Sequence, residues 1–243
     1  MDIGRKKVIV DNTVFDDLYN RIKLNAEELL PTLVTKAKQI NDVLKENLFA
    51  NDEYRQIVVN SAKNLFINDS MSQSGNGEHT DNSSTLNNLN RNKNSPLVRT
   101  NAHLDNAIRP VQDYLREFIE IVEHLTAWLE LEISSYANGD DFRIVVQNEI
   151  LDEFASMKAV SVAFLGQIFD YYEQRAAIGK EICKRPNIDD SKHLLVNIDE
   201  LMYSKAKLMM IEIEGYFLRI YNVLSKNEDI LKQSTRQHVD NYF

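Results

Sequence analysis

The stretch from Leu104 to Tyr136 constrains the fold more than any other part of the sequence. Its apolar residues recur at alternating spacings of three and four, a repeat that places one row of side chains along a helix. The row consists of Ile108, Val111, Leu115, Phe118, Val122, Leu125, Leu129, Ile133 and Tyr136. Ile121 and Trp128 add a second row, which widens the apolar face beyond that of a two-stranded coiled coil. We therefore predict one long helix of a helical bundle.

A second helical stretch is predicted from about Asp11 to Leu48. Its apolar face is formed by Val14, Leu18, Ile22, Ala26, Leu30, Leu33, Ala37, Ile40 and Leu44. Pro31 lies inside this stretch, and its missing N–H and its ring predict a kink or break near Leu30. From residue 49 to 66 the repeat weakens and supports a short helix.

Two more long helices are predicted in the second half of the chain. One begins near Val146 and ends at residues 184–187, where cations are followed by a proline. The other starts at the N-cap candidates 189–191 and fades near Leu231. Between 159 and 172 apolar residues surround more than one helix face, which favours contact with another subunit besides the bundle's own core.

The segment 136–142, Tyr-Ala-Asn-Gly-Asp-Asp-Phe, separates two of these helices. Gly139 is suited to a positive φ, and Asp140 or Asp141 is suited to cap the next helix. Taken by itself, this composition is typical of a tight turn.

Composition places the chain in the all-α class. Its 243 residues include seven Gly and four Pro, too few for the turns of a many-stranded sheet, and 43% are hydrophobic, enough for a sizeable core. Half of the residues between about 68 and 95 are Asn or Ser, and we expect a disordered insert there. Residues from about 232 to 243 are expected to form an exposed tail.

Charge and targeting signals exclude several classes of partner. The net charge of −9 disfavours nucleic acid and opposes binding to anionic membrane surfaces. The chain has neither a run of about 18 apolar residues nor the apolar core of a signal peptide near its start. The single cysteine, Cys183, fits a reducing compartment, and we expect it to be a buried structural thiol. These features predict the cytoplasm or the nucleus.

No catalytic constellation is visible. The nearest approach to a metal motif, Glu120, Glu123 and His124, lacks the Glu-x-x-His spacing of di-metal bundles, and we expect these residues on a solvated face. We therefore expect no enzyme activity, metal or cofactor, and a protein that acts by contact. The aromatic ending Asn241-Tyr242-Phe243 with its free carboxylate is typical of a segment that docks into a pocket, although an accident of sequence gives the same ending.

Short segments in order along the chain closely resemble the 11S proteasome activators, also called the REG family. They are 125–133 (LTAWLELEI), 138–142 (NGDDF), 145–147 (VVQ), 171–176 (YYEQRA), 186–188 (PNI), 198–200 (IDE) with Tyr203, and Glu212-Ile213 with Tyr216 and Tyr221. The resemblance covers residues 104–231 well and the first helix more loosely.

The resemblance implies one four-helix domain over residues 1–243, assembled as an elongated bundle into a heptameric ring. Such a ring caps the 20S proteasome without ATP and opens its axial gate. The implied activation loop consists of Ala137, Asn138, Gly139, Asp140, Asp141 and Phe142. Phe142 is expected to pack back on the helix ends and hold the loop rigid. Asn241, Tyr242 and Phe243 would enter pockets between outer-ring subunits of the proteasome.

The loop departs from the family pattern. Related loops read Gly-Asn-Asn-Phe-Gly, whereas this chain has Gly139-Asp140-Asp141-Phe142-Arg143, and ionised carboxylates cannot donate the hydrogen bonds that amides donate. The alternative function is an oligomeric helical adaptor or scaffold that has no effect on proteolysis.

Overall fold

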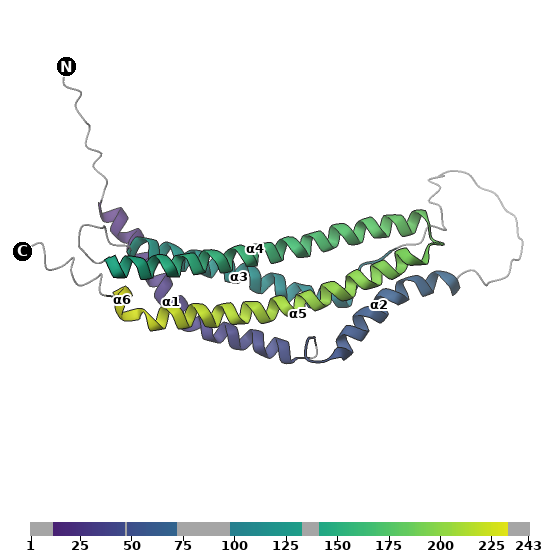
Figure 1. Cartoon of the computed structure of the whole chain (residues 1–243), viewed down its shortest axis with the longest axis horizontal. Coiled ribbons are helices and arrows are strands. Elements are labelled where there is room, and N and C mark those ends of the chain that lie inside the picture. Colours follow the sequence, from purple (N-terminus) through teal and green to yellow (C-terminus); the bar gives the residue numbers. More distant parts are fainter. Residues whose placement is uncertain (1–11, 47, 72–97, 133–140, 233–243) are drawn as a thin grey trace, which may run out of the picture. The chain divides into compact units, whose positions relative to one another are not determined.

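The computed structural model describes residues 12–46, 48–71, 98–132 and 141–232 (Figure 1). All regular secondary structure in these ranges is helical, which confirms the all-α prediction. The helices are α1 (Asn12–Lys45), α2 (Asp52–Met71), α3 (Ala102–Glu132), α4 (Asp141–Lys184), α5 (Asp189–Lys226) and α6 (Glu228–Lys232). Within the described ranges, no helix is both long and apolar enough to cross a membrane.

The chain forms two compact units. Unit 1 comprises residues 1–39, 116–162 and 213–243, and unit 2 comprises residues 40–115 and 163–212. The helices α1, α3, α4 and α5 each contribute one part to unit 1 and another to unit 2.

The apolar row predicted along α3 is confirmed. Every member of the row between Ile108 and Leu129 is at most 1% exposed, and Ile121 and Trp128 of the second row are buried too. The helix begins after Asn101, whose side-chain oxygen accepts a hydrogen bond from the Leu104 N–H at 3.3 Å. This is an N-cap, which satisfies one of the free donors of the first turn.

Of the kink or break predicted near Leu30, the break is wrong, because α1 continues through Pro31. The apolar contacts on both sides hold the helix together: Ala26 and Leu33 are fully buried. One turn of the helix also gains a side-chain bond, since the Thr32 hydroxyl donates to the Leu29 carbonyl at 2.6 Å. The apolar face predicted for the first turns of this helix is not buried at Val14, which is 54% exposed.

The helix α2 is longer than the sequence predicts. It has 20 residues and reaches Met71, so the predicted disordered insert begins inside it. The rest of that insert, 72–95, lies outside the described residues. Val59 and Ala62 of α2 pack with Val196 of α5 in unit 2. Such a small apolar face explains why the repeat in the sequence is weak.

The helix α4 begins at Asp141, five residues before the predicted start, and ends at Lys184 as predicted. The apolar run in its middle does face two ways, since Ile168 is 1% exposed and Phe169 is 63% exposed. The expectation of a buried thiol is wrong, because Cys183 is exposed. Its neighbour Ile182 occupies the inward position, and successive helical side chains point about 100° apart.

The core of unit 1 is apolar and aromatic where α3 meets α5. Phe118 is fully buried, with its ring centroid 5.2 Å from that of Phe217 and 5.5 Å from that of Tyr216. Edge-on and tilted ring pairs at these distances are favourable beyond the area that they bury.

Unit 2 contains a buried polar cluster, here called the Asp199 network: Asn101, Tyr171, Arg175 and Asp199. The Asp199 carboxylate is fully buried and accepts from Tyr171 Oη at 2.9 Å, Arg175 Nε at 2.9 Å and Asn101 Nδ2 at 3.0 Å. Asn101 Nδ2 also donates to the Val58 carbonyl of α2 at 3.0 Å. The network therefore joins α2, the cap of α3, α4 and α5, and three of its members belong to the segments that resemble the 11S family.

Candidate functional site

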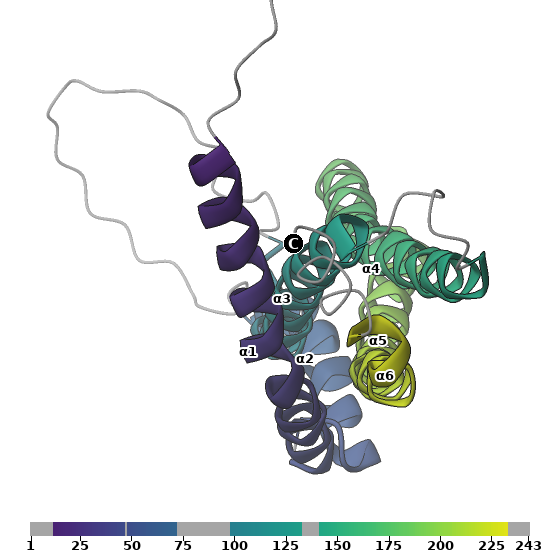
Figure 2. The same ribbon diagram turned by 90° about the vertical axis from the view of Figure 1, so that its left-hand side faces the viewer.

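The predicted contact segments fall mostly outside the described residues. Ala137, Asn138, Gly139 and Asp140 of the loop lie outside them, as do Asn241, Tyr242 and Phe243. Asp141 is the first residue of α4. The flanking elements are described, and all belong to unit 1: the end of α3, the start of α4 and α6. These elements lie at the left end in Figure 1 and face the viewer in Figure 2.

Phe142 does not pack back on the helix ends. It is 69% exposed in the first turn of α4, so the expectation that it buries itself against those ends is wrong. The inward positions of this turn belong to Arg143 and Ile144, each 5% exposed. An exposed phenylalanine on this turn is apolar surface available for contact with a partner.

The end of α3 is instead held by a polar cluster, here called the Glu132 clamp: Tyr19, Glu132, Arg143 and Gln147. Arg143 Nη2 donates to the Glu132 carbonyl oxygen at 2.9 Å, and Gln147 Nε2 lies 3.5 Å from the same oxygen. Tyr19 of α1 donates its hydroxyl to Glu132 Oε1 at 2.5 Å. Glu132, Arg143 and Gln147 are all buried. The last residue of α3 is thus bound through both its backbone and its side chain.

The hydroxyl of Tyr19 stays protonated over a wide pH range. Burial raises its pKa to about 12, and the hydrogen bond to Glu132 and the charge of that carboxylate act in the same direction. At neutral pH the hydroxyl is therefore a donor, as the bond to Glu132 requires.

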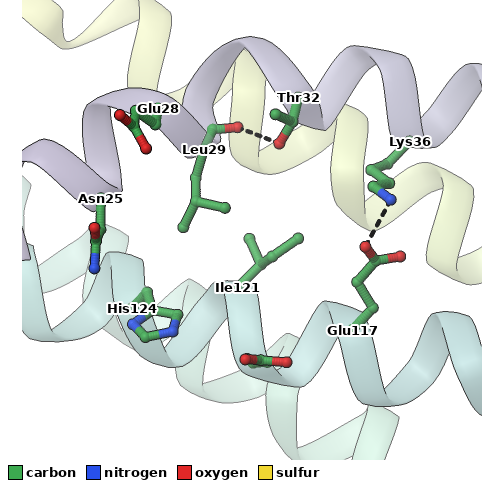
Figure 3. A pocket seen from close by; sticks show the side chains of 9 residues that line it. Asn25, Glu28, Leu29, Thr32, Lys36, Glu117, Ile121 and His124 are labelled. Atoms are coloured by element: carbon green, nitrogen blue, oxygen red, sulfur yellow. Dashed lines mark hydrogen bonds and ion pairs between the residues drawn. The ribbon is translucent and has the colours of Figure 1, made fainter.

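A groove of about 530 Å³ lies in unit 1 between α1 and α3 (Figure 3). Lys36 of α1 reaches Glu117 of α3 at 2.6 Å, and Glu120 and His124 line the groove further along α3. Among the described residues, no group of three or more His, Cys, Asp or Glu side chains is placed to hold a metal ion. The groove therefore offers charge but no coordination site within that part of the chain.

Comparison with known proteins identifies the class to which this fold and these helix ends belong. The family described as "Proteasome activator PA28, C-terminal" matches residues 97–241, which is more than half of the chain. The chain belongs to this family of proteasome activators.

Relatives and a solved structure agree with this assignment. The proteins named proteasome activator complex subunit 3 from Homo sapiens and Gallus gallus are each 24% identical over 147 residues, and each match covers 60% of this chain and 58% of the relative. The 11S subunit of the Plasmodium falciparum proteasome, PA28, matches with a TM-score of 0.69 at 18% identity. That match covers 96% of this chain and 99% of the other, so the two share a fold.

Sequence reasoning missed the Glu132 clamp. Gln147 stood within one of the segments that resemble the family, and Arg143 stood out as a departure from the family loop. Neither signal indicated burial, because that depends on where the end of α3 lies relative to α4. Tyr19 carried no signal, since it lies 113 positions from its partner.

Proposed function

We propose that this chain activates the 20S proteasome. Copies of it form a heptameric ring that caps the proteasome, opens its axial gate without ATP and stimulates peptide hydrolysis. The family match to residues 97–241 carries the proposal, because it spans the predicted activation loop and the helices from α3 to α6. The relatives named proteasome activator complex subunit 3 support the same activity, and the solved 11S subunit has the same fold.

Attachment and gate opening are assigned to different segments. A loop opens a gate only if its contacts favour the open arrangement over the closed one, because equal affinity for both shifts no population. We assign that difference to residues 137–142 and attachment to Asn241, Tyr242 and Phe243. Several weak tails on one ring act together, and linked sites commonly gain about 10²- to 10⁴-fold in avidity.

Exposed apolar side chains in unit 2 support the homo-oligomer. On α5, Leu194, Leu201 and Leu208 recur every seventh residue and are 54%, 55% and 65% exposed, and Phe169 of α4 is 63% exposed. Apolar residues at this spacing form a continuous stripe along a helix, and such a stripe usually marks an interface. Because Phe169 is outside the core, Phe169→Glu should dissociate the oligomer and leave the monomer folded.

A peptidase assay of purified 20S proteasome, with and without the chain, tests the proposal. The wild-type chain should stimulate hydrolysis of small peptides. Deletion of residues 241–243 should abolish binding and leave the oligomer intact. Asp141→Tyr should bind the proteasome and leave hydrolysis at the basal rate. Full stimulation by Asp141→Tyr would mean that the loop is only a turn between two helices and does not open the gate.

The alternative function, an oligomeric adaptor or scaffold, predicts that the ring forms but leaves peptide hydrolysis unchanged. The family assignment favours the activator, which acts by contact and not as an enzyme. We place this activity in the cytoplasm or the nucleus, since the single cysteine fits a reducing compartment.

A further inference from the structure

The carbonyl oxygen at the end of α3 has an unusual donor. The last carbonyls of a helix have no partner within the helix, and water or a nearby side chain usually satisfies them. Here the Glu132 carbonyl accepts from Arg143, which belongs to the first turn of the next helix. The hydrogen bond therefore joins the two helix ends that flank the predicted activation loop.

Arg143 lies in surroundings that are unusual for an arginine. Arginine is rarely buried, yet Arg143 is 5% exposed. A cation is also disfavoured in the first turn of its own helix, where the helix dipole is positive, and favoured beside the negative C-terminal end of another helix. The C-terminal end of α3 therefore contributes to the stabilisation of this guanidinium.

Two further residues hold Glu132, one at its backbone carbonyl and one at its side-chain carboxylate. Gln147, one turn after Arg143, is fully buried and brings its amide nitrogen within 3.5 Å of the Glu132 oxygen. Tyr19 holds the carboxylate of Glu132 from α1. The Oε1 atom of Gln147 has no hydrogen-bond partner within the described part of the chain.

We propose that Arg143 is a positioning residue for gate opening. It fixes the separation and direction of the two helix ends that carry the activation loop, with Gln147 and Tyr19 in support. This inference rests on the proposed activator function and adds a residue to it.

The test compares Arg143→Ala with wild type in two measurements. Saturating Arg143→Ala should stimulate peptide hydrolysis about tenfold less, since one hydrogen bond to a charged group changes an equilibrium by about that factor or more. The concentration that gives half-maximal stimulation should change by less than twofold, because the tails that attach the ring are intact. In the free protein, amide hydrogen exchange should become faster at residues 141–147.

Three variants separate positioning from general damage. Arg143→Lys keeps the positive charge and an ammonium group that can donate to the Glu132 carbonyl. It should therefore retain part of the stimulation. Gln147→Leu should reduce stimulation less than Arg143→Ala does. Lys158→Ala is the matched control, because Lys158 of α4 pairs with Glu123 of α3 at 2.8 Å and so joins the same two helices away from their ends. It should leave stimulation unchanged.

The proposal is overturned if Arg143→Ala stimulates as well as wild type, or if its stimulation falls together with binding or assembly. If the wild-type chain fails to stimulate the proteasome, the proposed function is wrong and the role in gate opening is wrong with it. The exchange rates are measured without the proteasome, so they still decide whether Arg143 fixes the helix ends.

Discussion

The Asp199 network of unit 2 and the Glu132 clamp of unit 1 are both buried polar clusters, but they differ in how their members are paired. In the Asp199 network a fully buried carboxylate receives donors from Asn101, Tyr171 and Arg175. In the Glu132 clamp a backbone carbonyl is the shared acceptor, and Gln147 Oε1 keeps a free lone pair within the described residues. Within the described residues, both carboxylate oxygens of Asp199 have donors, whereas one acceptor of the Glu132 clamp has none.

Because of this difference, we expect the Asp199 network to affect stability more and the Glu132 clamp to affect the proposed activity more. A closed network of charged groups fixes the packing of the helices that meet in it, and loss of one member leaves the others buried and unpaired. A cluster at a helix end changes the stability of the whole chain less, since helix ends are among the least stable parts of a fold. Such a cluster instead sets the direction in which the chain leaves the helix.

The largest predicted effect is on the Asp199 network. Asp199→Ala leaves the Arg175 guanidinium buried without its counter-ion, and breaking such a pair costs about 3–5 kcal/mol. Denaturation in urea should show this loss in the free energy of unfolding. Hydrogen exchange should increase in the helices of unit 2 before those of unit 1. A loss below about 1 kcal/mol would place the pair among exposed ion pairs and remove the contrast between the clusters.

A double variant sharpens this result. Asp199→Leu combined with Arg175→Met removes both charges and fills the site with apolar groups, which is often close to neutral for a buried pair. Recovery should be incomplete, because Tyr171 loses its acceptor whereas Asn101 keeps the Val58 carbonyl.

Local spacing was sufficient to predict the long helices. The row from Ile108 to Leu129 is buried as its repeat requires, and the basic residues and proline near Lys184 end α4 as predicted. Prediction failed where tertiary contacts outweigh local preference. Pro31 does not break α1, since packing on both sides of it offsets one missing hydrogen bond.

The candidate site was less predictable than the fold. The family resemblance predicted the position of the activation loop, but the residues of the Glu132 clamp come from three helices, and the Tyr19–Glu132 contact spans 113 positions. An arginine beside an acidic turn suggests a solvated cation. Its burial follows from the position of Glu132, which no repeat in the sequence encodes. The exposure of Phe142 has the same cause, because Arg143 and Ile144 occupy the inward positions.

The next effect is a loss of stability at alkaline pH, which we expect to be larger in unit 2 than in unit 1. Among the described residues, burial raises the pKa of Tyr54, Tyr171, Tyr172 and Tyr203 in unit 2, that of Tyr172 to about 12. In unit 1 it raises the pKa of Tyr19 to about 12. Unfolded tyrosine releases its proton near pH 10, so the stabilisation is complete below about pH 10 and is lost as the pH rises toward about 12.

Urea denaturation at a series of pH values measures this loss. Trp128 is the chain's single tryptophan and reports on unit 1, and hydrogen exchange reports on unit 2. Tyr171→Phe keeps the ring but removes one titrating proton, so its stability should depend less on pH than that of wild type. If the stability of the two units depended equally on pH, the expected difference between them would be contradicted.

The smallest effect is expected for the ion pair in the groove of unit 1. Lys36 and Glu117 lie 2.6 Å apart, but their side chains are 26% and 37% exposed, so water screens the pair and replaces it when it is broken. Lys36→Met keeps most of the apolar stem and should lower the free energy of unfolding by less than about 1 kcal/mol.

Salt distinguishes this pair from the Asp199 network. Lys36 is the one Lys or Arg among the described residues that line the groove, so its removal leaves Glu28, Glu117 and Glu120 without a nearby opposite charge there. Salt weakens repulsion between exposed charges, so the loss in Lys36→Met should shrink as salt is added, whereas the loss in Asp199→Ala should persist. Lys158→Met, which breaks a more exposed pair, is the control and should have a still smaller effect. A loss in Lys36→Met that matches that of Asp199→Ala and does not respond to salt would mean that unit 1 depends on a buried charge pair as unit 2 does.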